Sequence, residues 1–173
     1  LANTFSDNCN LTLQIPNVKG KVSLADCLSN LVKPERLYGQ NKYQCSACNS
    51  KVNALKTSCI GSCPPVLIVD LVRYNMGKKH SDIIQYPKTL NLHGTQLKLL
   101  TNKSVKNGQE KLKLENDTAQ SAVYDLYAMI QHQGSSRQFG HYFAYCRGFE
   151  TPNTWYLCND ESVSKVNGVE AAL

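Results

Sequence analysis

The run VYDLYAMIQHQGSSRQFGHYFAYCRGFETPNTWYLCND, residues 123–160, decides the fold of this chain. It contains three segments rich in aromatic and apolar residues, at 123–130, 142–147 and 155–158, and a shorter one follows at 163–166. Glycine, serine, proline and asparagine separate these segments, and such residues favour turns. The pattern predicts consecutive β-strands joined by short loops.

Two elements are predicted near the start of the chain. Residues 5–15 alternate between apolar and polar side chains, which predicts a half-buried strand that Pro16 stops. Ser23 followed three residues later by Asp26 is the signature of a helix N-cap. Apolar residues then recur at helical spacing, and Pro34 ends the predicted helix.

The middle of the chain adds strands and a polar segment. A nearly continuous apolar run over 66–74 predicts a central strand covered on both faces. A polar loop is expected at 75–81 and a short strand at 83–86. Residues 101–119 are almost entirely polar, and we expect an exposed insertion there. Strands outnumber helices, so the expected class is α+β with a largely antiparallel sheet.

Composition excludes several classes of protein. The 173 residues are enough for one domain with a sizeable core. An apolar share of 42% is too high for an intrinsically disordered chain, and no collagen-like repeat is present. No apolar run approaches the ~20 residues of a membrane span, so we expect a soluble protein. The basic residues behind the net charge of +6 are scattered, which disfavours nucleic-acid binding.

Cysteine is abundant, with residues at positions 9, 27, 45, 48, 59, 63, 146 and 158. A disulfide-stabilised secreted scaffold is usually shorter and richer in loops than this chain. Several of the cysteines lie within apolar stretches, where a free thiol behaves as a small hydrophobe. We therefore expect a reducing, intracellular location, in the cytoplasm or the nucleus.

A histidine at a junction between a loop and a strand is the first candidate for chemistry. His141 follows Gly140 and opens the segment HYFAYCR, and Asn159-Asp160 ends the next strand. A hairpin of this length returns Asn159 beside His141, where its side chain can accept the ring N–H and fix the tautomer. Such a pair forms the base and the orienting group of a Cys-His-Asn triad. A purely structural histidine is the alternative reading of the same spacing.

The order of the motifs in this block resembles that of a known enzyme family. They follow as YDLYAMIQH (124–132), Gly134, GHY (140–142), Trp155 and Asn159-Asp160. This order closely resembles the histidine-containing box of the ubiquitin-specific proteases, which are cysteine deubiquitinases. Upstream, CSAC (45–48) and PPVL (64–67) resemble the fingers-to-palm passage of the same family. The resemblance covers nearly the whole chain apart from 101–119.

The resemblance implies a papain-like cysteine protease fold of the α+β class, of which the chain would form the palm and fingers part. One partial catalytic domain would then occupy residues 1–173. The fingers and a helical segment would lie in 1–63, and the palm with its polar insertion at 101–119 in 64–173. The implied reaction is thiol-dependent hydrolysis of the isopeptide or peptide bond after the C-terminal glycine of ubiquitin. Ubiquitin or ubiquitinated proteins are the implied partners.

The resemblance also implies roles for individual residues. His141 would be the general base, and Asn159 would occupy the third position of the triad. Asp160 matches a position that the family often keeps acidic, where it would support the oxyanion or help orient the histidine. Gly140 and Tyr142 would bind substrate, with Gly140 leaving room for an extended Gly-Gly backbone.

The family's nucleophile motif, Asn-x-Gly-Asn-Thr-Cys-Tyr, is absent from this sequence. Cys9 is the obvious substitute, but it lies on the apolar parity of the first predicted strand rather than at a helix N-terminus that would stabilise a thiolate. We therefore expect the nucleophile to lie outside this chain, and the chain alone to be inactive.

A zinc site is predicted at Cys45 and Cys48. Two intervening residues allow both thiolates to bind one tetrahedral ion. In the family such a pair often joins a second pair from earlier in the fingers. Cys59 and Cys63 could complete four ligands, but both lie where the family has apolar residues, which favours buried thiols.

Two other functions compete with a catalytic part. A non-catalytic ubiquitin-binding or scaffolding module of the same fold would retain His141 and Asn159 only as relics. An unrelated zinc-ribbon nucleic-acid binder would need concentrated basic charge and a self-contained set of four ligands, and the scattered lysines argue against it.

Overall fold

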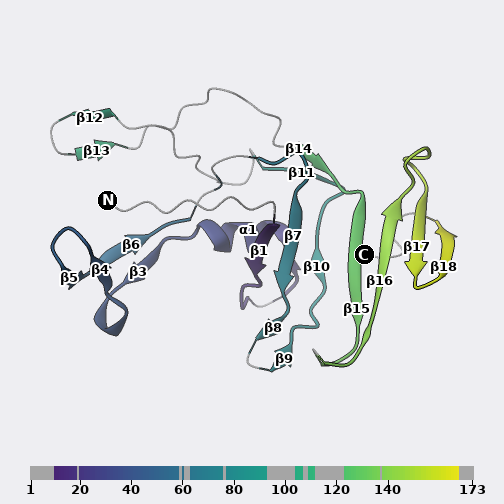
Figure 1. Ribbon diagram of the computed structural model, residues 1–173, viewed down its shortest axis with the longest axis horizontal. Helices are drawn as coiled ribbons and strands as arrows, with labels where there is room; N and C mark the ends of the chain where they lie inside the picture. The colour runs from purple at the N-terminus through teal and green to yellow at the C-terminus, as the bar shows by residue number, and fades with distance from the viewer. Residues whose placement is uncertain are drawn as a thin grey trace.

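The computed structural model describes residues 10–18, 20–58, 60, 63–75, 77–92, 104–106, 109–111, 123–136 and 138–167. Within these residues the chain is mostly strand, with one α-helix and one short 3-10 helix, and it forms an elongated molecule (Figure 1). Eight of the ten strand pairings are antiparallel, as predicted. No helix in the described part of the chain has the length and apolar character needed to cross a bilayer.

The first layer consists of the helix packed against a parallel pair of strands. β1 (Asn10–Gln14) pairs along its whole length with β7 (Ile68–Val72). Leu13 is fully buried while its neighbours Thr12 and Gln14 are exposed, which confirms the predicted alternation. Residues 5–9 of the predicted strand lie outside the described residues.

The helix α1 (Leu24–Val32) begins and ends where the sequence predicts. The Ser23 hydroxyl accepts a hydrogen bond from the backbone N–H of Asp26, and the Asp26 carboxylate accepts one from the backbone N–H of Ser23. These reciprocal bonds form a capping box, which satisfies donors that a helix N-terminus leaves free. A second parallel pair, β2 (Val22–Ser23) with β10 (Ile84–Gln85), lies beside this start.

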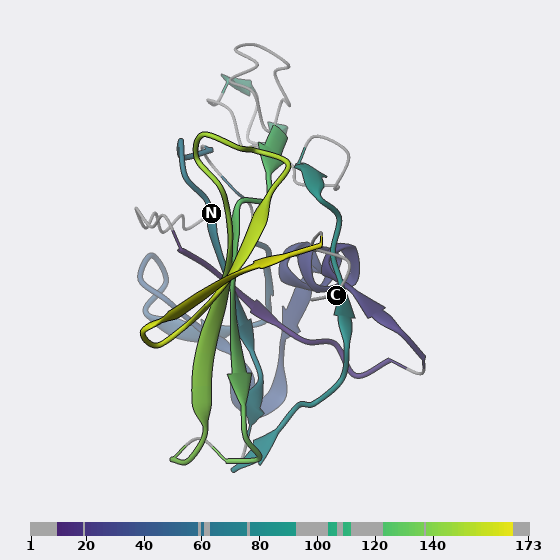
Figure 2. The same ribbon diagram turned by 90° about the vertical axis from the view of Figure 1, so that its right-hand side faces the viewer.

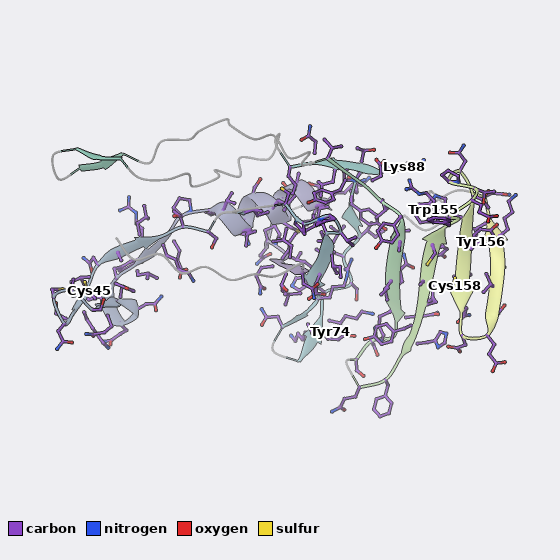
Figure 3. The ribbon with its side chains drawn as sticks, turned by 45° about the horizontal axis from the view of Figure 1, so that its top comes forward. Cys45, Tyr74, Lys88, Trp155, Tyr156 and Cys158 are labelled. Carbon is purple, nitrogen blue, oxygen red and sulfur yellow. The ribbon has the colours of Figure 1, made fainter. Side chains whose placement is uncertain are left out.

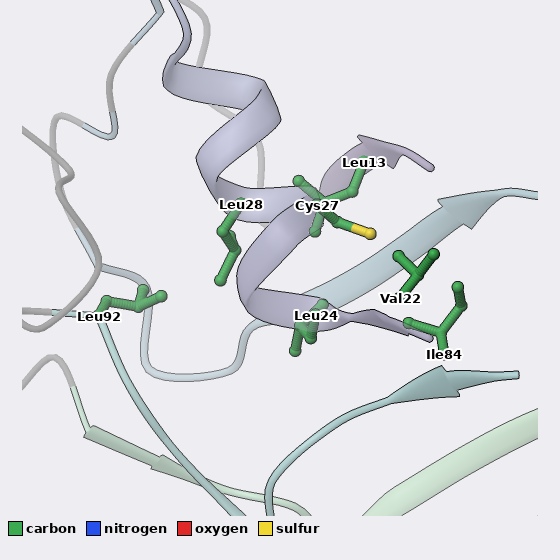
Figure 4. Close-up of a cluster of buried hydrophobic side chains, with 7 residues drawn as sticks. All are labelled: Leu13, Val22, Leu24, Cys27, Leu28, Ile84 and Leu92. Carbon is green, nitrogen blue, oxygen red and sulfur yellow. The ribbon is translucent and has the colours of Figure 1, made fainter. Parts of the chain in front are cut away.

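The apolar side of α1 forms the larger of two buried clusters. Cys27 and Leu28 on the helix are fully buried and meet Leu13 of β1 (Figure 4). The other buried members are Val22, Leu24, Ile84 and Leu92. Burying a leucine or isoleucine side chain stabilises a fold by about 1.5–3 kcal/mol, so this cluster is the main anchor of the first layer.

An arm of short antiparallel strands extends away from this layer (Figure 1). It contains two pairs, β3 (Glu35–Leu37) with β6 (Ala54–Lys56) and β4 (Tyr43–Cys45) with β5 (Ser50–Val52). The 3-10 helix η1 (Gly39–Asn41) connects β3 to β4.

The C-terminal part forms a four-stranded antiparallel sheet in simple chain order. Its strands are β15 (Ala128–Gln133), β16 (His141–Arg147), β17 (Trp155–Asn159) and β18 (Ser162–Val166). The strands rotate progressively across the sheet, so that β18 crosses β15 at a large angle (Figure 2). Met129 and Trp155 form the second buried cluster on one face of this sheet.

Several elements differ from the sequence-based expectations. The strand expected over 123–130 is two strands, β14 (Val123–Asp125) and β15, because β14 pairs instead with β11 (Thr89–Asn91). The loop expected at 75–81 contains a hairpin of β8 (Tyr74–Asn75) and β9 (Lys78–Lys79). The expected insertion at 101–119, for which no secondary structure was predicted, contains a second hairpin, β12 (Ser104–Lys106) with β13 (Gln109–Lys111).

The prediction that 66–74 is covered on both faces is wrong. Val66 and Ile68 are 48% and 49% exposed, and Asp70 is also exposed. Among the described residues β7 pairs only with β1, and only its other face packs against the first cluster. A continuous apolar run therefore does not prove burial on both sides.

Candidate active site

His141 and Asn159 meet because neighbouring antiparallel strands begin and end at the same edge of the sheet. His141 is the first residue of β16 and Asn159 is the last of β17. The register places Ala144 opposite Cys158, which puts both site residues on one face of the sheet. Nε2 of His141 and Oδ1 of Asn159 form a hydrogen bond. The predicted juxtaposition of these two side chains is confirmed.

This hydrogen bond selects one tautomer of the imidazole. An amide oxygen only accepts, so Nε2 of His141 carries the hydrogen and donates it to Asn159. Nδ1 of the neutral ring then holds a lone pair, and no described residue bonds to it. The His141 side chain is 44% exposed, so the ring is accessible.

Asp160 lies directly after Asn159, in the turn between β17 and β18. Its carboxylate Oδ2 is 3.8 Å from Nε2 of His141, within reach of an ion pair once the ring is protonated. Its backbone has φ of 49°, in the left-handed region that aspartate tolerates better than most residues. Asp160 therefore fits the backbone conformation of the turn, and its carboxylate can stabilise a protonated His141.

Aromatic rings support His141 along β16. The Phe143 ring stacks on the His141 ring with centroids 6.5 Å apart, and Tyr145 meets Phe143 edge to face at 5.9 Å. Tyr145 in turn packs on the cluster of Met129 and Trp155. A row of rings on one face thus connects the imidazole to the core of the sheet.

The two predicted substrate-binding residues, Gly140 and Tyr142, both lie against His132. A Cβ built on Gly140 would lie 2.0 Å from Nε2 of His132 and 2.7 Å from the carbonyl oxygen of Gln133. Glycine is therefore needed here for internal packing, whatever a substrate requires. Tyr142 points to the opposite face from His141, where its ring lies 4.6 Å from that of His132 and is 61% exposed.

A polar cluster missed by the sequence analysis holds the loop before His141. Lys79 on β9 donates hydrogen bonds to Nδ1 and the carbonyl oxygen of His132 and to the carbonyl oxygen of Gly134. The Tyr74 hydroxyl contacts the same Nδ1 and the carbonyl oxygen of Ser136. Lys79 lies in a segment expected to be a polar loop, so spacing alone gave no signal for this cluster.

None of the six described cysteines shares the face of the sheet that carries His141. Cys146 and Cys158 lie on the opposite face, and burial raises the pKa of the Cys146 thiol. Cys27 is fully buried in the first cluster and Cys63 packs against it as a half-buried thiol. Cys9 and Cys59 lie outside the described residues, so the structure does not test their predicted roles.

Cys45 lies at the tip of the arm, at the opposite end of the molecule from Trp155 and Cys158 (Figure 3). Cys48 follows in the turn between β4 and β5. Hydrogen bonds from the backbone N–H groups of Cys48 and Ala47 lower the pKa of the Cys45 thiol. Such a turn favours thiolates, the form that binds zinc. No described group of three or more histidine, cysteine or acidic side chains is arranged to hold a metal, so this pair supplies at most two of four ligands.

Comparison with known proteins links this geometry to a family of hydrolases. Residues 14–172 match the family described as "Ubiquitin carboxyl-terminal hydrolase". The chain is 31% identical over 157 residues to ubiquitin carboxyl-terminal hydrolase 48 of Danio rerio, and 32% identical over 179 residues to ubiquitin carboxyl-terminal hydrolase 21 of Mus musculus. These alignments cover 91% and 98% of this chain, but only 14% and 27% of the relatives.

Solved structures agree with the sequence relatives. A chain of a SAGA DUB module bound to monoubiquitin matches 94% of this chain with a TM-score of 0.65 and 27% identity. A SAGA DUB module bound to ubiquitin aldehyde matches the same share with a TM-score of 0.63 and 26% identity. In both cases this chain covers about a third of the matched one (32% and 33%). The mostly antiparallel strands and single helix correspond to the fingers and palm part of the papain-like fold. The chain therefore belongs to the ubiquitin carboxyl-terminal hydrolase family.

Proposed function

We propose that this chain supplies the histidine half of a cysteine deubiquitinase active site. The proposed reaction is hydrolysis of the isopeptide or peptide bond after the C-terminal glycine of ubiquitin. The observation that carries the proposal is the hydrogen bond between Nε2 of His141 and Asn159, which leaves Nδ1 of an accessible ring as the proton acceptor. Family membership supports the class of reaction.

The chemistry follows from the free lone pair on Nδ1. His141 takes the proton of a cysteine thiol there, and the thiolate attacks the carbonyl carbon of the ubiquitin C-terminal glycine. Asn159 holds the ring through Nε2, and the nearby carboxylate of Asp160 stabilises the imidazolium. The imidazolium returns its proton to the leaving amine, which gives a thioester. His141 then deprotonates a water that hydrolyses this thioester and restores the thiol.

The nucleophilic thiol is proposed to lie outside this chain. Cys146 and Cys158 are on the wrong face of the sheet, and burial disfavours the thiolate of Cys27. Cys45 lies at the far end of the molecule, and Cys48 follows in the same turn (Figure 3). The chain alone is accordingly proposed to be inactive.

Ubiquitin is the proposed partner. The matched DUB modules are bound to monoubiquitin and to ubiquitin aldehyde, which supports an equivalent role for the shared fold here. Gly140 and Tyr142 are proposed to contact its extended C-terminal tail. The exposure of the Tyr142 ring supports such a contact.

We further propose that Cys45 and Cys48 bind a structural zinc ion together with ligands outside the described residues. The lowered pKa of Cys45 supports this role. The test is the zinc content of the purified protein. Cys45→Ser should remove the metal, whereas Cys146→Ser, which changes a cysteine in the sheet, should retain it. Full zinc content in the Cys45→Ser protein would contradict the proposal.

The catalytic proposal is tested with ubiquitin that carries a cysteine-reactive electrophile at its C-terminus. The 173-residue chain alone should not be labelled, and the same chain joined to its upstream segment should be labelled at a cysteine of that segment. Labelling of the chain at one of its own cysteines would overturn the placement of the nucleophile. Binding of ubiquitin without labelling in either form would instead identify a non-catalytic ubiquitin-binding module.

A further inference from the structure

Lys79 is the central residue of a polar cluster that also contains Tyr74 and His132 and that contacts the loop before His141. Its ammonium group contacts Nδ1 of His132 at 3.0 Å and the carbonyl oxygens of His132 and Gly134 at 2.9 Å and 2.6 Å. An ammonium has three hydrogens to donate, and these three acceptors use all of them. Hydrogen bonds from a charged donor are about twice as strong as neutral ones, so this group ties β9 firmly to the end of β15.

The cluster also fixes the state of His132. Because an ammonium cannot accept, Nδ1 of His132 is the acceptor and the ring is neutral, with its hydrogen on Nε2. The Tyr74 hydroxyl lies 3.0 Å from the same Nδ1 and 3.1 Å from the carbonyl oxygen of Ser136, so it ties the loop as well. The other side of the His132 ring fills the space that a Cβ on Gly140 would need.

The loop from residue 134 to residue 140 has few other anchors. Between its described residues, the one hydrogen bond seen joins the backbone N–H of Phe139 to the Ser136 hydroxyl. Phe139 itself is 77% exposed. The ladder pairing of Gln133 with His141 fixes the end of the loop, and the contacts from Lys79 and Tyr74 add anchors within it, at Gly134 and Ser136.

We propose that Lys79, Tyr74 and His132 are positioning residues for His141. They hold the loop so that His141, the first residue of β16, directs its ring toward Asn159. This inference rests on the proposed function, because it takes His141 to be the general base. It adds that the orientation of this base depends on a hairpin, β8 to β9, which contacts the end of β15 through Lys79.

The first experiment observes His141 directly and needs no catalytic activity. In the ¹⁵N-histidine-labelled chain, the Nε2 proton of His141 should be visible by NMR, since its hydrogen bond to Asn159 slows exchange with water. Lys79→Met should lose this signal through exchange, and Tyr74→Phe, which removes only a hydroxyl, should broaden it. Lys78→Met is the matched control, because Lys78 is the exposed neighbour on the same strand. An unchanged His141 signal in a folded Lys79→Met protein would overturn the proposal.

The second experiment measures ubiquitin hydrolysis by this chain joined to its upstream segment. Lys79→Met should lower kcat by about 10- to 100-fold, because a misplacement of about 1 Å costs that much, while KM changes little. His132→Asn keeps an acceptor near the position of Nδ1 and should retain more activity than His132→Leu. Equal losses in these two variants, or a loss confined to KM, would contradict positioning. An inactive wild type would refute the proposed function, whereas the NMR result would still decide the role of Lys79.

Discussion

At the scale of single residues, the site shows which placements follow from spacing and which do not. The hydrogen bond between His141 and Asn159 was predictable because a hairpin of adjacent strands brings its two ends together. The need for glycine at position 140 was not predictable, because the His132 ring, which occupies the space that a Cβ there would need, comes from the neighbouring strand. Its partner Lys79 is farther still in sequence, and no local pattern marks it.

Cys45 and Cys146 are expected to form thiolates at different pH values. Backbone N–H groups of Cys48 and Ala47 lower the pKa of Cys45, so its thiolate forms at lower pH than that of an ordinary cysteine. Burial, followed by the neighbouring Cys158 thiol, raises the pKa of Cys146, so its thiolate forms at higher pH. In metal-free protein, the pH midpoint of iodoacetamide labelling, followed for each peptide by mass spectrometry, should therefore be lower for Cys45 than for Cys146. The reverse order would contradict the geometry of the Cys45–Cys48 turn.

At the scale of elements, the helix was the most predictable part of the chain. Ser23, Asp26 and Pro34 specify its ends locally, and the structure shows the capping box that the first two predict. The hairpins of β3 to β6 and of β8 to β9 have strands of only two or three residues. So short a strand cannot show a hydrophobic period, which is why sequence alone did not locate them.

Removing one side chain from the helix should weaken the whole first layer. Leu28→Ala should lower the free energy of unfolding by about 2–5 kcal/mol, because Leu28 is fully buried and its truncation leaves a cavity. Ser29→Ala, at the exposed neighbouring position, should change it by less than about 0.5 kcal/mol. Urea unfolding followed by circular dichroism measures both values. Equal effects would show that the cluster around α1 is not a core.

The capping box makes helix stability depend on pH. Hydrogen bonds from the Ser23 hydroxyl and then its backbone N–H lower the pKa of Asp26 in the folded state. The ionised carboxylate therefore stabilises the fold above its unfolded pKa of about 3.9, and this contribution is lost as the pH falls through the folded value. The free energies of unfolding of wild type and Asp26→Asn, measured with urea, should differ at pH 7 and converge at the lowest pH. A difference between them that persists in acid would contradict the stabilising role of the ionised Asp26 carboxylate.

At the scale of the molecule, the chain has two small cores. One surrounds α1, and the other lies on one face of the sheet of β15 to β18. The proposed base sits at an edge of that sheet, while Cys45 lies at the far tip of the arm (Figure 3).

The class of the fold was predictable from the sequence, but the packing of its strands was less so. The order and antiparallel pairing of β15 to β18 follow from their closeness in sequence. The parallel pair of β1 and β7 joins residues more than fifty positions apart, and nothing in either strand specifies the partner. The apolar run at 66–74 was misread for the same reason, because burial depends on what packs against each face.

Hydrolysis of a fluorogenic ubiquitin C-terminal amide tests most directly whether His141 is the general base and whether Asn159 orients its ring. The assay uses this chain joined to its upstream segment, with His80→Ala as the matched control, since the His80 side chain bonds to the carboxylate of the loop residue Asp82. His141→Ala should lower kcat by at least about 100-fold, Asn159→Ala should cause a smaller loss, and His80→Ala should leave the rate unchanged. Full activity in His141→Ala would contradict the account.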